Sequence, residues 1–379
     1  MFDAALPLWG SSGVDAEHGG FLEELSLTGR PTAVGFKRLR AQCRQVYVFS
    51  HASMLGWKQG EALAAMGYEY LVTKAWMGPD KGWAKTLSRQ GDVLDPTPDL
   101  YDIAFALFAC AWRLRASHDP DALRRMHETL DFVEAHLRPA PGVAASEGYW
   151  HQLPPDSPRL QNPHMHLCEA CLAAFEATQD QRFLDQARAM VNLFRAHLFD
   201  GATLGEYFTA DWRRLGGERG RILEPGHQFE WAWILAQYAK HTGDDASNEA
   251  GALVQFSERH GVDLATQFTF NTMRDDGAPL DRGSRTWPNT ERIKGWLGVF
   301  ELLGHDPTAQ IEGSTRLLLD RYLAVTPRGS WMDAFDAEQR PSASAAPTST
   351  LYHVFLAFAE VLRLEPKLRQ LGDPQSALY

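Results

Sequence analysis

The sequence has few cysteines, no long hydrophobic run and no excess of basic residues. Its four cysteines, Cys43, Cys110, Cys168 and Cys171, all lie in apolar, helix-like segments, so we expect reduced thiols rather than a disulfide framework. No apolar run approaches the roughly 18–20 residues that span a bilayer. The N-terminus has no basic region ahead of an apolar stretch, so no signal peptide is expected. These absences predict a soluble, cytoplasmic protein without a membrane partner.

The balance of charge excludes another class of partner. Lys and Arg total 37 against 48 Asp and Glu, which leaves a formal net charge of -11. An acidic surface of this size argues against nucleic acid as a partner. The 379 residues are 44% hydrophobic, enough for a large core, and no low-complexity linker divides them. We therefore expect a single domain over residues 1–379.

Helical periodicity dominates the chain and comes in two alternating kinds. From Asp121 to Leu137, apolar residues recur every three or four positions, as on the buried stripe of a half-exposed helix. Residues from Phe183 to Leu198 follow the same pattern. Between such segments lie helices that are apolar nearly all round, for example YDIAFALFACAW from Tyr101. A helix that is apolar on every face is covered on every face.

The buried helices recur at a regular interval. Their expected starts are about 60 residues apart, which is a typical signature of a repeat architecture. These starts are near Lys37, Asp99, His164, Pro225, Pro288 and Pro347. Six helix pairs predict an all-α fold, an (α/α)6 barrel of six inner and six outer helices.

Polar and aromatic residues gather near the starts of the predicted inner helices, where they would face a central pocket. A sugar-sized polar ligand requires such a mixture of stacking faces and hydrogen-bonding groups. The candidates are Arg44, Tyr101, Asp102, Asn162, His164, His166, Glu169, His227, Glu230, Trp287, Glu291 and His353.

Cofactor sites have weaker support in the sequence. His164 and His166 are two residues apart, so on a helix they cannot share a metal ion. His227 and Glu230 share a helix face, but a further ligand would have to come from another repeat, so zinc stays an alternative without a specific spacing. The Cys168–Cys171 CxxC has no strand before it and is typical of small core residues. No GxGxxG or P-loop pattern occurs in a strand–helix context, so no nucleotide cofactor is expected.

Five motifs together resemble the N-acylglucosamine 2-epimerase superfamily, and within it the D-mannose isomerases. They are RQVYVFSHA, NPHMHLCEA, EPGHQFEWAW, RTWPNTERIKGW and STLYHVFLA, and the likeness extends from GGFLEEL near Gly19 to His353. The resemblance implies the same (α/α)6 barrel.

The resemblance also implies roles for individual residues. It places the acid/base pair on His227 and His353. The substrate-binding residues that it implies are Arg44, Tyr101, Asn162, His166, Glu230 and Trp287. Glu230 is expected to orient His227 from one helical turn away. Where epimerases of the family often have two adjacent tryptophans, this chain has Thr286–Trp287.

These residue types suit proton transfer on an open-chain sugar, because histidine titrates near neutral pH and arginine stabilises an enediolate without titrating. We expect a metal-free, nucleotide-free aldose–ketose isomerase that converts D-mannose to D-fructose, with D-lyxose to D-xylulose as a further reaction.

The alternative is a 2-epimerase of N-acylglucosamine, mannose/glucose or cellobiose type. An (α/α)6 glycoside hydrolase or lyase is a third reading, but glycosidases need two carboxylates roughly 5–10 Å apart. The expected partner is a monosaccharide, and a homodimer is a possible assembly.

Overall fold

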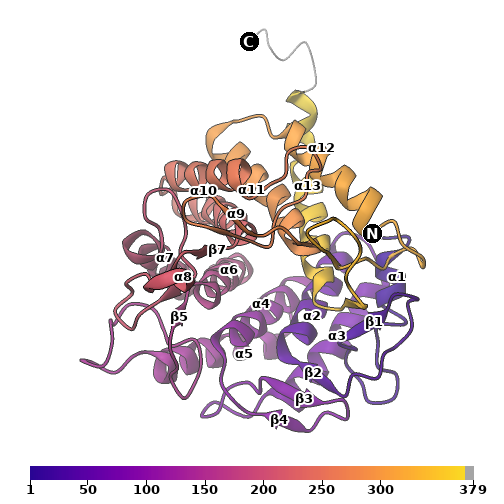
Figure 1. Ribbon diagram of the computed structural model, residues 1–379. Helices are drawn as coiled ribbons and strands as arrows, with labels where there is room; N and C mark the ends of the chain where they lie inside the picture. Colours follow the sequence, from indigo (N-terminus) through magenta and orange to yellow (C-terminus); the bar gives the residue numbers. More distant parts are fainter. Residues whose placement is uncertain (372–379) are drawn as a thin grey trace.

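Six long helices surround the centre of the protein in a computed structural model that describes residues 1–371 (Figure 1). Each inner helix packs against the next, and the last packs against the first, so the ring is closed. Each inner helix starts within three residues of its predicted position. The ring comprises α2 (Leu39–Met54), α4 (Leu100–Ser117), α6 (Asn162–Thr178), α9 (Pro225–Thr242), α11 (Thr286–Leu303) and α13 (Thr350–Leu371). The predicted (α/α)6 barrel is confirmed.

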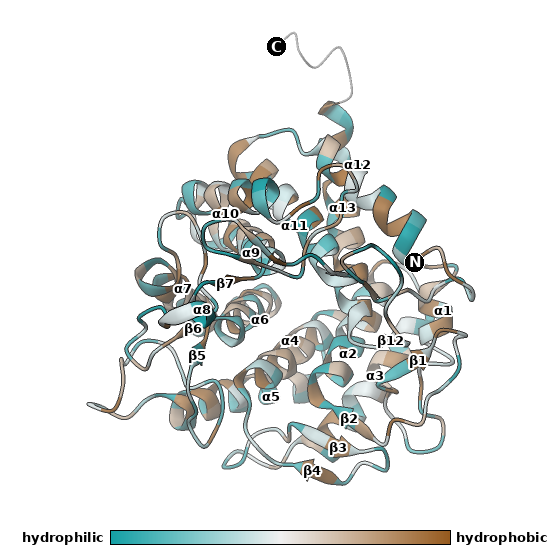
Figure 2. Cartoon of the chain, viewed as in Figure 1, coloured by the Kyte–Doolittle hydropathy of each residue, from teal (hydrophilic) through white to brown (hydrophobic). Residues whose placement is uncertain are grey.

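Amphipathic helices cover the outside of this ring. In α5, for example, the buried positions include Ala122, Met126 and Leu130, and Figure 2 shows hydrophilic residues on the same helices as hydrophobic ones. The outer helices are α3 (Gln59–Tyr70), α5 (Pro120–Phe132), α7 (Gln181–Leu193), α10 (Ser247–His260) and α12 (Thr308–Leu317). All but α10 continue into π-helical turns, η1 (Leu71–Ala75), η2 (Val133–Leu137), η3 (Phe194–Leu198) and η4 (Leu318–Tyr322).

The seam between the last and first repeats holds a shorter element than the sequence predicts for a sixth outer helix. The N-terminal helix α1 (Ala5–Trp9) has only five residues. Its Trp9 stacks on Trp331 with ring centroids 4.5 Å apart, so α1 packs against the segment that follows α12 and η4. The indole Nε1 of Trp9 also donates to the carbonyl oxygen of Gly329 at 3.0 Å. Two aromatic rings thus close this position in place of a long helix.

Short antiparallel strands link neighbouring repeats at one end of the barrel. Five inner helices directly follow a strand, and that strand pairs with one from the next repeat along the ring. The pairs are β2 (Phe36–Arg38) with β3 (Thr86–Ser88), β5 (Arg159–Leu160) with β6 (Tyr207–Phe208), β7 (Ile222–Leu223) with β8 (Thr272–Arg274), β10 (Ser284–Arg285) with β11 (Ala334–Phe335), and β12 (Ala345–Pro347) with β1 (Glu24–Ser26). The hairpin strands β4 (Val93–Asp95) and β9 (Pro279–Asp281) extend two of these sheets, and α8 (Gly217–Gly220) lies in a loop. The strands hold the inner-helix N-termini at one rim.

Local sequence fixes where the inner helices begin. The side chain of Asp99 accepts hydrogen bonds from the backbone N–H groups of Tyr101 and Asp102, which caps α4. Pro163 and Pro225 lie in the first turns of α6 and α9, where the missing N–H costs nothing.

The four cysteines are buried and free. Within residues 1–371, no helix is long and apolar enough to cross a membrane.

Candidate functional site

The N-terminal turns of the inner helices enclose a cavity of about 480 Å³, which we call the front cavity. Eight of the twelve candidates from the sequence line it: Arg44, Tyr101, Asn162, His166, His227, Glu230, Trp287 and His353, whereas Asp102, His164, Glu169 and Glu291 do not. They come from all six inner helices. The lining also includes residues that the sequence did not single out: Arg38, Arg40, Asp99, His151, Glu224, Arg285 and Asp333.

His227 is held by Glu206, which precedes strand β6. The Nδ1 atom of His227 lies 3.1 Å from both carboxylate oxygens of Glu206. Gln161 donates from Nε2 to Glu206 Oε2 at 3.0 Å, and Trp231 donates to the amide oxygen of Gln161 at 2.9 Å. Because Trp231 occupies that oxygen, the amide nitrogen of Gln161 faces the carboxylate. The orienting partner of His227 is therefore Glu206 and not Glu230.

The surroundings of His227 favour its charged form. The side chain is 6% exposed, and burial alone opposes a positive charge. The carboxylates of Glu206 and Glu224 outweigh that effect and raise the pKa of His227 to about 10. At neutral pH this histidine is an imidazolium that can donate a proton.

His353 has the opposite electrostatic environment. Its Nδ1 lies 2.7 Å from Glu291 Oε1, and Lys294 Nζ lies 2.6 Å from the other oxygen of Glu291. Burial, together with the positive charges of Arg44 and Lys294, lowers the pKa of His353 well below its usual range. Burial raises the pKa of Glu291, but the ammonium of Lys294 at 2.6 Å opposes this effect and supplies the counter-charge. With Glu291 ionised, its carboxylate accepts from Nδ1–H and leaves Nε2 of His353 with a free lone pair. This neutral imidazole can accept a proton.

His166 forms a third histidine–carboxylate pair. Its Nδ1 is 2.9 Å from Glu169 Oε2, and the Tyr352 hydroxyl donates to Glu169 Oε1 at 2.5 Å. The ring of Tyr101 lies edge-on to His166, with centroids 4.9 Å apart. His164 points elsewhere, as its spacing predicts: its Nε2 accepts from the backbone N–H of Tyr149 at 2.9 Å, outside the front cavity.

Trp287 lies next to both acid/base candidates. Its ring centroid is 5.1 Å from that of His227 and 5.7 Å from that of His353. Gly226 makes this approach possible, because a Cβ there would lie 2.4 Å from the Trp287 ring. The glycine of the EPGH motif is thus required by packing.

Arg44 is buried among aromatic rings with its charge directed at the front cavity. It donates from Nη2 to the Tyr101 hydroxyl at 2.7 Å. Its guanidinium lies 4.2 Å from the ring centroid of Phe105 and 4.9 Å from that of Tyr352. The stacked rings fix a permanent positive charge in place beside His353.

The arginines at the mouth of the front cavity are already paired. The Nε atom of Arg38 lies 2.7 Å from Glu23. Arg40 lies 3.4 Å from Asp102, and Arg285 lies 3.4 Å from Glu224. Each of these three cations therefore has an acidic partner, whereas the buried Arg44 forms no ion pair among the described residues.

Three sets of side chains have metal-ligating atoms close together. They are His166–Glu169–Glu230, Glu206–Glu224–His227 and Glu230–Glu291–His353, with the atoms of each set within 4.8 Å of one another. In each set a histidine Nδ1 is already hydrogen-bonded to a carboxylate of the same set, so a metal held by Nδ1 and that carboxylate together would have to displace the bond, whereas Nε2 stays free. Lys294 is a further obstacle in the third set, since its ammonium lies 3.8 Å from Glu230 and 2.6 Å from Glu291. The donor chemistry therefore favours histidine–carboxylate pairs.

Two supporting residues were not found by sequence reasoning. Glu206 is a single acidic residue in a loop, and only the pairing of β5 with β6 brings it beside Gln161 and His227. Lys294 lies within the quoted motif RTWPNTERIKGW. A lysine one turn after a glutamate on a helix that is otherwise buried was an available signal for an internal ion pair, because an unpaired ammonium is very costly to bury.

Comparisons with known proteins identify the family and agree with the fold. The family model of N-acylglucosamine 2-epimerase (GlcNAc 2-epimerase) matches residues 19–357. A mannose-6-phosphate isomerase of Rhizobium meliloti (strain 1021) is 33% identical over 370 residues, which cover 95% of this chain and 94% of that protein. A solved D-mannose isomerase superposes with a TM-score of 0.85 at 22% identity, covering 96% of each chain. The cellobiose 2-epimerase of Spirochaeta thermophila DSM 6192 gives 0.84 at 24% identity, covering 97% of this chain and 95% of that one.

The substitution Glu206→Gln tests the electrostatic account of His227. Removing this carboxylate should lower the pKa of His227 from about 10, because Glu206 is the strongest of the groups that raise it. Nuclear magnetic resonance of ¹⁵N-labelled histidine rings, recorded during a pH titration, reports the charge directly. Glu258→Gln, which removes the partner of Arg292 on the outer helix α10, is the matched control and should leave the titration unchanged. A neutral His227 in the wild-type protein at about pH 8 would contradict the account.

Proposed function

The chain belongs to the N-acylglucosamine 2-epimerase family, and we propose that it is an aldose–ketose isomerase that interconverts D-mannose and D-fructose, and also D-lyxose and D-xylulose. Relatives in this family are sugar isomerases and sugar 2-epimerases, so the chain is an enzyme that acts on sugars. We further propose that the reaction needs neither metal nor nucleotide, because the chain's own side chains supply every proton-transfer group.

The observation that carries the proposal is the contrast between two histidines on one cavity: His227 lies against the carboxylate of Glu206, whereas the Glu291 carboxylate beside His353 is already paired with Lys294. His353 is neutral and can take a proton from carbon, whereas His227 is charged and can donate one to oxygen. Two titratable groups with pKa values driven apart by their surroundings are typical of an acid/base pair. Trp287 lies beside both rings and gives a sugar one stacking face.

The reaction can be written with these groups alone. Nε2 of His353 removes the proton from C2 of the open-chain aldose while His227 protonates the carbonyl oxygen on C1, which gives an enediol. His227 then takes back the proton from the hydroxyl on C2, and His353 delivers its proton to C1, which gives the ketose. Negative charge that develops on either oxygen is stabilised by Arg44, and both histidines end in their starting states. His166, oriented by Glu169, is placed to assist opening of the sugar ring.

The front cavity favours an unphosphorylated sugar. A phosphate needs cations that are free to bind it, and Arg38, Arg40 and Arg285 each have an acidic partner. Arg44 has none, but in this mechanism it binds the oxygens on C1 and C2. We therefore propose D-mannose rather than its phosphate ester, although one relative carries the name mannose-6-phosphate isomerase.

A 2-epimerase is the second candidate, favoured by one observation. His227 and His353 come from different helices and both lie against Trp287, as two groups flanking C2 would. Against it, Thr286 is buried, with its hydroxyl 3.3 Å from the carbonyl oxygens of Met332 and Asp333, and it does not line the cavity. Among the described lining residues Trp287 is the only tryptophan, so a second sugar ring has little aromatic surface to stack on.

The fate of the C2 proton tests the proposal. D-Mannose incubated in D₂O, with protein dialysed exhaustively against a chelator, should give D-fructose with deuterium in one stereochemical position at C1. D-Mannose 6-phosphate should react more slowly than D-mannose. Nuclear magnetic resonance of the products distinguishes the outcomes. Early formation of D-glucose deuterated at C2 would favour the epimerase, and activity that is lost on dialysis and restored by zinc or manganese would contradict the metal-free mechanism.

Histidine variants test the assignment of roles. His227→Asn and His353→Asn should each lower kcat by at least about 10²-fold, since a positioned proton-transfer group contributes about 10²–10⁴-fold. His164→Asn is the control, because His164 lies on the same helix, two residues before the front-cavity residue His166, yet its ring forms hydrogen bonds only to backbone groups. Its kcat should stay close to the wild-type value, with folding checked by circular dichroism. An equal loss at His164 would show that the acid/base roles are misassigned.

A further inference from the structure

A second cavity, of about 580 Å³, lies at the opposite end of the barrel; we call it the rear cavity. The inner helices that line the front cavity with their first turns, all except α11, line the rear cavity with later turns. On α6, for example, His166 faces the front cavity and Glu176 the rear cavity, and on α9 His227 faces the front and Gln237 the rear. The two cavities therefore share helices but no lining residue.

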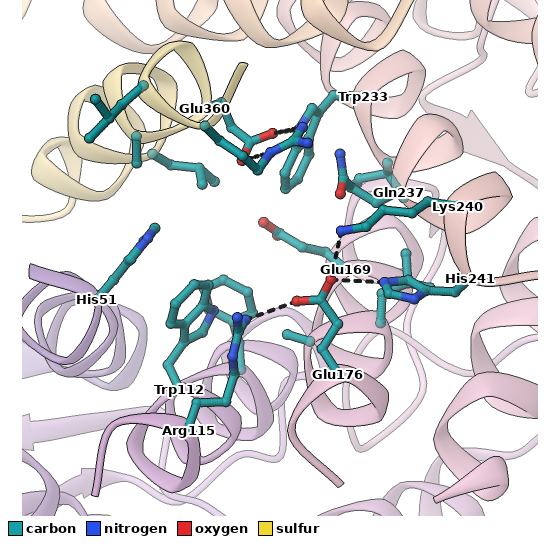
Figure 3. Close-up of a pocket in the computed structure, with 18 of the residues that line it drawn as sticks. His51, Trp112, Arg115, Glu169, Glu176, Trp233, Gln237, Lys240, His241 and Glu360 are labelled. Carbon is teal, nitrogen blue, oxygen red and sulfur yellow. Dashed lines mark hydrogen bonds and ion pairs between the residues drawn. The ribbon is translucent and has the colours of Figure 1, made fainter. Parts of the chain in front are cut away.

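Polar and aromatic side chains converge on the rear cavity from several helices. Figure 3 shows His51, Trp112 and Arg115 across an open centre from Gln237, Lys240 and His241, with Glu169 between the two groups. In the same view Trp233 and Glu360 close another side. The Trp233 indole donates to Glu360 at 2.7 Å, so that side of the wall is fixed.

Two donors on this wall have no hydrogen-bond partner. The indole Nε1 of Trp112 and the amide Nε2 of Gln237 are both buried and unpaired. Trp112 is only 8% exposed, and its ring is held between His51, stacked at 4.2 Å, and the guanidinium of Arg115, also at 4.2 Å. A buried donor without a partner is less stable than one that is hydrogen-bonded. A rigid, unpaired indole N–H on a cavity wall is a binding group that an acceptor would satisfy.

The charges on the rear cavity are balanced. Arg115, Lys240 and His241 all contact Glu176, at 2.9, 3.3 and 2.9 Å, and Arg363 lies 2.7 Å from Glu360. With Glu169, three carboxylates face the three cations Arg115, Lys240 and Arg363. This end of the barrel also holds the C-termini of the inner helices, whose dipoles disfavour anions. An anionic ligand would have to break existing ion pairs, whereas a neutral one would not.

We propose that the rear cavity is a second binding site, for a neutral polyhydroxyl compound of monosaccharide size. The cavity is somewhat larger than the front cavity. Hydroxyl groups can both accept from Trp112 and Gln237 and donate to Glu169 and Glu360. The inference rests on the rear cavity alone and stands whether or not the proposed isomerase activity does.

The rear site is in direct contact with a residue that supports the front cavity. Glu169 lines the rear cavity, while its carboxylate holds Nδ1 of His166 and accepts from Tyr352. A hydroxyl group that binds Glu169 from the rear cavity therefore competes with the hydrogen bonds that Glu169 forms to His166 and Tyr352, which orient the front-cavity residue His166.

D-Mannitol is a suitable probe, because it has six hydroxyl groups and no carbonyl group that the protein could isomerise. Binding is measured by isothermal titration calorimetry to Arg44→Leu, which impairs the front cavity, and to the double variant Arg44→Leu/Trp112→Phe, which also removes the unpaired indole N–H. Trp76→Phe in the Arg44→Leu background is the matched control, since Trp76 lies outside both cavities. Crystals soaked in D-mannitol show where it binds.

Arg44→Leu should still bind one D-mannitol per chain, with density in the rear cavity, and Trp112→Phe should weaken this binding by about 10-fold or more. Trp76→Phe should not change it. If Trp112→Phe does not fold, Gln237→Leu removes the other unpaired donor and should have the same effect. Density confined to the front cavity, equal affinity in the two Arg44→Leu backgrounds, or inorganic phosphate occupying the rear cavity in place of D-mannitol would each overturn the proposal.

Discussion

The hydrogen bond between a buried carboxylate and histidine Nδ1 is the interaction on which the front cavity depends. It occurs three times, in the pairs His166–Glu169, His227–Glu206 and His353–Glu291. Each bond fixes the ring and leaves Nε2 as the atom available to a ligand. The pairs differ in the other charged groups that lie near each histidine–carboxylate pair. A second acid, Glu224, adds to the first at one histidine, whereas Lys294 and Arg44 oppose the proton at another. In the mechanism that we propose, one kind of pair thereby yields one acid and one base.

The barrel makes these pairs possible because it joins residues that are far apart in sequence. Glu291 and His353 are 62 residues apart, and Glu169 and Tyr352 are 183 apart. The ring of short strands fixes the N-termini of the inner helices at one rim, and the pairing of β1 with β12 closes it. The same helices then continue to the other end, where their later turns form the rear cavity. That residues 1–379 form a single domain stays a prediction, which the closed ring over the described residues supports.

The barrel and the lining of the front cavity were predictable from sequence, but the supporting carboxylate of His227 was not. Apolar helices that recur about every 60 residues predict the barrel, because each of them must be covered on every face. Residues in the first turns of such helices point inward, so His227 and His353 could be placed. Glu206 lies in a loop of another repeat, and the adjoining strand β6 has two residues, too few to show a period. Spacing alone therefore suggested Glu230 as the partner of His227, and the structure corrects this.

We propose that His353 and His227 act as base and acid because their pKa values are displaced in opposite directions. A pH profile of kcat/KM for D-mannose tests this most directly, because it reports the essential ionisations of the free enzyme. A base whose pKa is lowered places the acidic limb well below pH 6.5, and an acid with a pKa of about 10 places the alkaline limb near pH 10. The account predicts a broad plateau between those limbs. A narrow bell with both limbs near pH 6.5, the ordinary value for histidine, would contradict it.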